Sequence, residues 1–144
     1  MRRVPIEPTG STVRKTNSGA GRVLVAVYGI FALAATARAS VQLLTKFEQA
    51  PLAYLLSALA GVIYIVATIT LARGTGASRR LALIAIIIEL VGVVSVGTLS
   101  VLNPEAFPRA TVWSSYGIGY GFVPLVLPIL GLAWLWRTRP VTPQ

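Results

Sequence analysis

The chain has 144 residues, of which 55% are hydrophobic and 12% charged, whereas soluble domains carry about 25% charged residues. Lys and Arg together number 13 against four acidic residues, which gives a net charge of +9, and the sequence contains no Cys and no His. This composition excludes a soluble globular domain, disulfides, metal or haem ligation by Cys or His, and Ser-His-Asp catalysis, so that no metal and no cofactor is expected.

Residues 1–22 are polar and basic, contain Pro5 and Pro8, and show little periodicity. This pattern predicts a disordered cytoplasmic tail. Its basic side chains make the tail a candidate for binding anionic lipids, or they only set the membrane orientation. No nucleic acid partner is expected, because the basic residues of the chain flank apolar runs instead of forming one soluble patch.

Four apolar runs follow, at residues 23–44, 52–72, 81–101 and 113–136, and a short C-terminal tail covers residues 137–144. Each run holds the roughly 20 residues that a helix needs to cross about 30 Å of hydrocarbon. Only a helix satisfies the backbone of a single lipid-exposed segment. The sequence therefore predicts an all-α four-helix transmembrane bundle.

The basic residues predict the orientation of this bundle. Most of them lie in residues 1–22, 73–80 and 137–144, whereas the other two loops carry only Lys46 and Arg109. The positive-inside rule then places both termini in the cytoplasm. The excess of Arg over Lys is typical of a GC-rich bacterial genome, so we expect a multi-pass protein of a bacterial plasma membrane. Cleavage of the first helix after small residues at 35–37 is an alternative that leaves the other orientations unchanged.

Aromatic residues flank the fourth run. Phe107, Trp113 and Tyr116 are expected at the outer interface of the membrane, where amphipathic rings are stabilised. Two acidic residues, Glu48 and Glu105, lie in different outer loops and are expected to be solvated charges.

Two ionisable residues lie inside the predicted spans. Glu89 is near the middle of the third helix and Arg38 is in the outer part of the first, where a charge costs about 2.5 kcal/mol or more. Tyr64 of the second helix lies at a similar depth to Glu89. We expect these three residues to form a buried polar cluster. The cluster fixes helix register, or binds a proton or a cationic substrate, or one of its charges meets a charge on a partner subunit.

Small residues recur at helical spacing and predict close helix packing at Gly61 and Gly92. In the fourth run glycine occupies positions 117, 119 and 121, which do not form one helical face. Pro124 and Pro128 each remove a backbone hydrogen bond and are expected to kink this helix. A broken helix that lines a cavity is one interpretation, and a kinked helix packed through its glycines is the other.

The segment Ile86–Gly92 resembles the small multidrug resistance exporters, four-helix proteins in which a membrane-embedded Glu exchanges protons for cationic drugs. In those exporters the Glu lies on the first helix, whereas Glu89 lies on the third. Over its full length the chain is similar to uncharacterised small four-helix integral membrane proteins of actinobacteria, through the segments at residues 37–40, 50–54 and 120–125. That resemblance implies no activity.

No catalytic residue is expected, because the only carboxylate at depth has no partner base. The sequence favours a non-enzymatic accessory or scaffolding subunit of a larger plasma-membrane assembly. Its partners would be the lipid bilayer and other membrane subunits or a second copy of the chain. The alternative is a small proton-coupled transporter that works as a homo-oligomer through Glu89.

Overall fold

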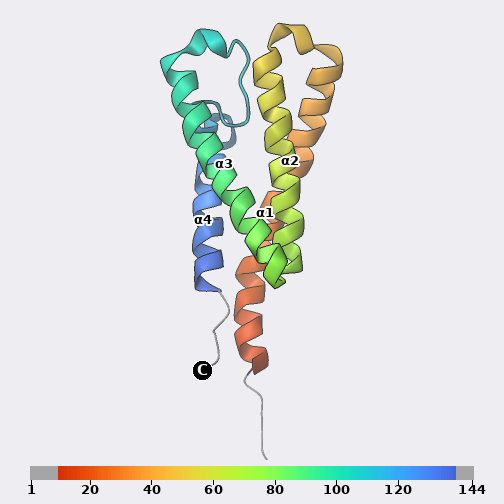
Figure 1. Cartoon of the computed structure of the whole chain (residues 1–144), viewed down its shortest axis with the longest axis vertical. Helices are drawn as coiled ribbons and strands as arrows, with labels where there is room; N and C mark the ends of the chain where they lie inside the picture. The colour runs from red at the N-terminus through yellow and green to blue at the C-terminus, as the bar shows by residue number, and fades with distance from the viewer. Residues whose placement is uncertain (1–9, 139–144) are drawn as a thin grey trace, which may run out of the picture.

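A computed structural model of the chain describes residues 10–138, with side chains from Gly19 onward, and the regular elements of the described part are all helices. Figure 1 shows the main helices running side by side along the long axis of the molecule. In chain order the elements are α1 (Gly10–Thr45), η1 (Phe47–Gln49), α2 (Pro51–Arg73), α3 (Gly76–Leu102), η2 (Pro104–Ala106), η3 (Ser114–Tyr120) and α4 (Val123–Arg137). The expectations for residues 1–9 and 139–144 fall outside the described residues.

Three helices are long and apolar enough to cross a membrane, at Gly19–Thr45, Pro51–Arg73 and Gly76–Leu102. A fourth span exists if η3 and α4, which meet at an angle of 98°, are counted together. Large apolar side chains cover the outside of the bundle and small or aromatic ones fill the inside. The molecule therefore has the construction of a multi-pass membrane protein, in which lipid covers the apolar exterior.

The bounds of α2 and α3 follow from local signals in the sequence. Pro51 occupies the first turn of α2, where its missing N–H is not needed. Gly74 ends α2 in the left-handed conformation (φ 68°), which glycine adopts without a steric penalty. Thr75 then caps α3, because its hydroxyl accepts a hydrogen bond from the N–H of Ser78 (3.4 Å). The expected range 52–72 thus differs from α2 by one residue at each end.

Helix α1 begins earlier than the sequence indicates. It starts at Gly10, so the disordered tail expected over residues 1–22 is helical from Gly10 onward. Figure 1 shows this first part of α1 extending beyond the ends of the other helices. No proline occurs between Pro8 and Pro51, and each residue added to an existing helix gains a hydrogen bond without a new nucleation step. The polar composition of residues 10–22 therefore does not end the helix.

The fourth apolar run is not one helix. Its first part, η3, contains left-handed backbone at Ser115 and Tyr116 as well as at Gly117, and the left-handed residues Gly121 and Phe122 separate it from α4. The 98° bend between η3 and α4 lies before the prolines at which a kink was expected. Pro124 lies in the first turn of α4, where proline is tolerated, and α4 continues through Pro128 to Arg137. The break precedes both prolines.

Helices α1 and α2 approach each other closely around Gly61. A Cβ atom at this position would lie 3.0 Å from Oγ1 and 3.5 Å from Cα of Thr36 on α1. The face of α2 on which small residues recur at helical spacing is largely buried: Ala53, Ser57, Gly61 and Tyr64 are buried and Thr68 is half-buried. On α1 the buried line instead passes through Ala32, Ala35 and Ala39. Arg38, expected to point into the bundle, is exposed.

Candidate functional site

The centre of the bundle contains one carboxyl group. Glu89 lies thirteen residues from each end of α3 and its side chain is fully buried. The hydroxyl of Tyr28, on α1, donates a hydrogen bond to Oε1 of Glu89 (2.6 Å). The second oxygen, Oε2, is buried and has no hydrogen-bond partner in the described part of the chain. One of the two oxygens of this carboxyl group therefore makes no hydrogen bond within the described residues, which is costly in an apolar interior.

Aromatic rings surround this carboxyl group. The ring of Tyr64, on α2, lies 6.2 Å from that of Tyr28 and 5.8 Å from that of Phe31, measured between centroids. The hydroxyl of Tyr64 accepts a hydrogen bond from Nε1 of Trp113 (3.0 Å). Offset and edge-on arrangements of this kind stabilise aromatic clusters beyond the area that they bury. The cluster joins α1, α2 and the segment that precedes η3.

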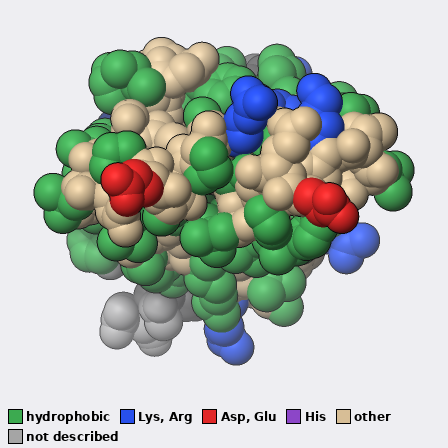
Figure 2. Space-filling view, turned by 90° about the horizontal axis from the view of Figure 1, so that it is seen from above, with side chains coloured by type: hydrophobic (Ala, Val, Ile, Leu, Met, Phe, Trp, Pro, Cys, Tyr) green, Lys and Arg blue, Asp and Glu red, His purple; other side chains and the backbone are tan. Residues whose placement is uncertain are grey.

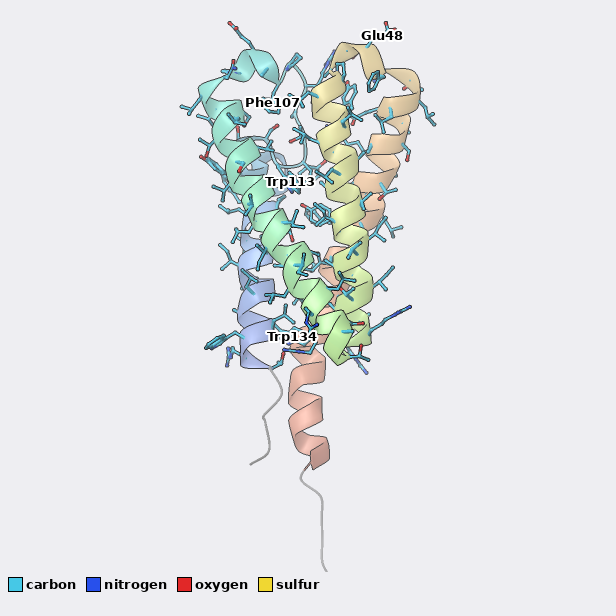
Figure 3. All side chains as sticks on the ribbon, in the orientation of Figure 1. Glu48, Phe107, Trp113 and Trp134 are labelled. Atoms are coloured by element: carbon cyan, nitrogen blue, oxygen red, sulfur yellow. The ribbon has the colours of Figure 1, made fainter. Side chains whose placement is uncertain are left out.

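Trp113 reaches this cluster because the chain turns back into the bundle after η2. Figure 3 shows Trp113 between α2 and α3, deeper in the molecule than Phe107. Only 1% of the Trp113 side chain is exposed, so its expected place at the outer interface is wrong. The burial of Trp113 is possible because its indole N–H finds an acceptor inside the protein.

Two glycines of α3 make room for the returning segment, which is the part of the chain between η2 and α4. A Cβ atom on Gly92 would lie 2.5 Å from the ring of Trp113, and one on Gly97 would lie 2.4 Å from the ring of Tyr116. The backbone N–H of Ser115 also donates to Oγ of Ser100 (2.8 Å). Gly92, predicted to pack against another helix, instead packs against a tryptophan ring. Gly97, which packs against Tyr116, was not predicted as a packing position.

The predicted polar cluster is only partly assembled. Tyr64 belongs to the aromatic rings around Glu89, but Arg38 does not contact the carboxyl group and instead donates a hydrogen bond to the hydroxyl of Tyr120. The hydrogen-bond partner of Glu89 is Tyr28, on α1, and not Arg38. Tyr120 was not predicted as a partner, because hydropathy does not reveal that η3 folds back toward α1.

Arg79 has a structural role that its position in a basic loop does not reveal. Its guanidinium donates to the carbonyl oxygen of Leu135 (2.8 Å) and to Oγ1 of Thr138 (3.2 Å). Basic side chains at a helix C-terminus satisfy carbonyl groups that the helix leaves free. Arg79 therefore ties the start of α3 to the end of α4.

The acidic residues outside the bundle interior do not form a site. Viewed from the end that carries η1 and η2, the acidic side chains form two separate spots (Figure 2). Glu48 and Glu105 lie in these two elements and are exposed. The described residues contain no group of His, Cys, Asp or Glu side chains that could hold a metal ion.

The arrangement around Glu89 can bind a proton or hold helices in register, since it offers one carboxyl oxygen without a partner and one that is hydrogen bonded. It does not present a nucleophile with an adjacent base within the described residues. Comparison with protein-family models, with curated proteins and with solved structures finds no match to this chain.

Proposed function

We propose that the chain is a non-enzymatic accessory subunit of a larger assembly in a bacterial plasma membrane, and that Arg38 contributes to the contact with the partner. The observation that carries this proposal is the position of Arg38. Its side chain is exposed on α1, seven residues before the last helical residue, Thr45, which is about 10 Å inside the end of the helix.

An exposed guanidinium at this depth is costly without a counter-charge. The described part of the chain offers Arg38 only the neutral hydroxyl of Tyr120. One turn further along α1, the Oε1 atom of Gln42 also has no hydrogen-bond partner among the described residues. A membrane partner that carries a carboxylate at this level would satisfy Arg38, because arginine pairs with carboxylates through two parallel hydrogen bonds.

The test is site-specific crosslinking of the full-length protein in its native membrane. A photoreactive amino acid replaces Val41, which is 57% exposed and lies three residues from Arg38. We expect one crosslinked partner in a stoichiometric complex, and about tenfold less of it in Arg38→Gln with unchanged helical content. Arg73→Gln is the control, because Arg73 is also exposed but lies at the end of α2. Recovery of monomers alone, or an equal yield from Arg38→Gln, would refute the proposal.

The second candidate is the small proton-coupled transporter, which the unpartnered Oε2 atom of Glu89 favours. In that case the chain would form a homo-oligomer and exchange protons for an organic cation. Wild-type protein in vesicles with an imposed pH gradient would then transport ethidium, Glu89→Gln would abolish the flux without loss of folded protein, and Arg38→Gln would retain it. Absence of ethidium flux from the wild type under a gradient of either direction would rule out this exchange of protons for an organic cation.

A further inference from the structure

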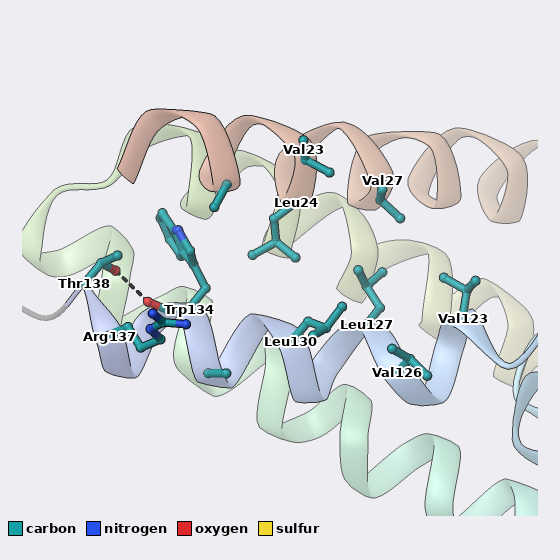
Figure 4. Close-up of a pocket in the computed structure, with 12 residues that line it drawn as sticks. Val23, Leu24, Val27, Val123, Val126, Leu127, Leu130, Trp134, Arg137 and Thr138 are labelled. Atoms are coloured by element: carbon teal, nitrogen blue, oxygen red, sulfur yellow. Dashed lines mark hydrogen bonds between the residues drawn. The ribbon is translucent and has the colours of Figure 1, made fainter. Parts of the chain in front are cut away.

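We propose that the groove between α1 and α4 binds one anionic phospholipid, from the membrane leaflet on the side where Arg137 lies. The groove has a volume of about 810 Å³ and Figure 4 shows its two walls. Val23 and Val27 of α1 face Val126 and Leu130 of α4 across it, and Trp134 and Arg137 lie at one end. One end is therefore polar and the remaining walls are apolar.

The length of the groove matches one leaflet. Along α4 the lining before the polar end extends from Val123 to Trp134, which are eleven residues apart, and eleven residues of helix rise about 16 Å. Half of a hydrocarbon core of about 30 Å is about 15 Å. An acyl chain that follows the groove would thus reach from the bilayer centre to its edge, and Arg137 lies almost one helical turn beyond Trp134, at the level of the headgroup.

The volume of the groove, about 810 Å³, is typical of small-molecule sites. A single acyl chain is narrower than a helix and can lie along the apolar wall.

The charge at the polar end selects the headgroup. Arg137 is exposed, and Arg22, next to Val23 on α1, is exposed as well. Neither α4 nor the described side chains of α1 include an acidic residue. The indole Nε1–H of Trp134, a residue that lines the groove, is buried and has no hydrogen-bond partner in the described part of the chain. Cationic side chains at the membrane surface attract anionic lipids, whereas an organic cation would be repelled here.

The test uses the delipidated full-length protein in detergent and native mass spectrometry. The probes are phosphatidylglycerol and phosphatidylcholine with identical acyl chains. We expect one phosphatidylglycerol per chain to bind at least tenfold more tightly than phosphatidylcholine. Arg137→Gln should weaken phosphatidylglycerol binding about fivefold, as expected for the loss of one basic residue at the membrane surface, and Val126→Trp should abolish binding of both lipids by filling the groove.

Two control variants separate a defined site from lipid that surrounds any membrane protein. Arg73→Gln removes an exposed basic residue outside the groove, and Val62→Trp adds a ring to the exposed face of α2. Both should bind phosphatidylglycerol as the wild type does. Equal binding of the two lipids, equal effects of Arg137→Gln and Arg73→Gln, or full binding by a folded Val126→Trp variant would overturn the proposal.

Discussion

Glu89 and Tyr28 form a hydrogen bond in the middle of the bundle. Among the described residues it is the only side-chain hydrogen bond there that involves a carboxyl group. Both side chains are fully buried, so water cannot replace either partner. Removal of one partner therefore leaves the other with an unmet hydrogen bond in an apolar medium, which costs about 1–3 kcal/mol. This pair couples α1 to α3 across the bundle.

We predict that Tyr28→Phe lowers the free energy of unfolding by about 1–3 kcal/mol, because Glu89 then loses the donor to Oε1. Denaturant titration in detergent micelles, followed by circular dichroism, measures the effect. Tyr54→Phe is the matched control: Tyr54 is 2% exposed, and no hydrogen bond of its hydroxyl is described. Equal stability of the two variants would show that the bond between Tyr28 and Glu89 contributes nothing.

Residue depth was predictable from the sequence, but residue pairing was not. Counting 1.5 Å per residue places Glu89 and Tyr64 at similar depths, and both are buried near the centre of the bundle. Opposite charge favoured Arg38 as the partner of Glu89, yet the buried line on α1 passes through Ala35 and Ala39 and leaves Arg38 outside. A different rotation of α1 about its axis is enough to bring Tyr28, and not Arg38, to Glu89.

The returning segment between η2 and α4 depends on glycine at the positions where its rings meet α3. The rings of Trp113 and Tyr116 occupy the space that a side chain on Gly92 or Gly97 would need. The segment also satisfies its own polar groups, since Thr98 and Tyr116 share a hydrogen bond of 2.9 Å. Irregular backbone at membrane depth is tolerated only where protein encloses it in this way.

We predict that Gly92→Ala destabilises the protein by about 1–3 kcal/mol, because the new Cβ atom would lie 2.5 Å from the Trp113 ring and well-packed interiors resist added atoms. Gly29→Ala is the control within a helix, since its Cβ atom would meet Thr68 at an ordinary 3.6 Å. It should be neutral or stabilising by up to about 1 kcal/mol, because alanine favours the helix. Thermal unfolding followed by circular dichroism reports on both variants, and similar effects would contradict the packing described here.

Helix position was predictable where hydropathy and capping residues agree, as at Pro51 and Gly74 of α2. The fourth run was predicted as one span, either a broken helix or a kinked helix, because its hydropathy is continuous. The information on the break lies in the alternating glycines, but Ser115, Tyr116 and Phe122 also adopt left-handed backbone, which their residue types disfavour. The ring of Tyr116 packs against Gly97 and its hydroxyl shares a hydrogen bond with Thr98, and hydropathy does not reveal such tertiary contacts.

At the scale of the whole molecule, the contacts of Arg79 bear on how η3 and α4 lie in the membrane. Arg79 lies near the start of α3 and bonds to Leu135 at the end of α4, whereas η2 lies at the opposite end of α3. The chain between η2 and Arg137 therefore passes from one end of the bundle to the other. Helix α4 supplies 15 residues of this passage, about 22 Å, and the returning segment supplies the remainder.

We predict from this passage that η3 and α4 together form a fourth membrane span and that both termini face the cytoplasm. Because the natural sequence has no Cys, single cysteines can be placed without background. A membrane-impermeant maleimide should label Glu48→Cys and Glu105→Cys in intact cells, but should label Ala77→Cys and a cysteine added after Gln144 only after permeabilisation. Labelling of the C-terminal cysteine in intact cells, with Ala77→Cys still protected, would mean that η3 and α4 form a re-entrant loop that returns to the outer side. Labelling of Ala77→Cys and of the C-terminal cysteine in intact cells, with Glu48→Cys and Glu105→Cys protected, would mean that the basic residues do not determine the orientation.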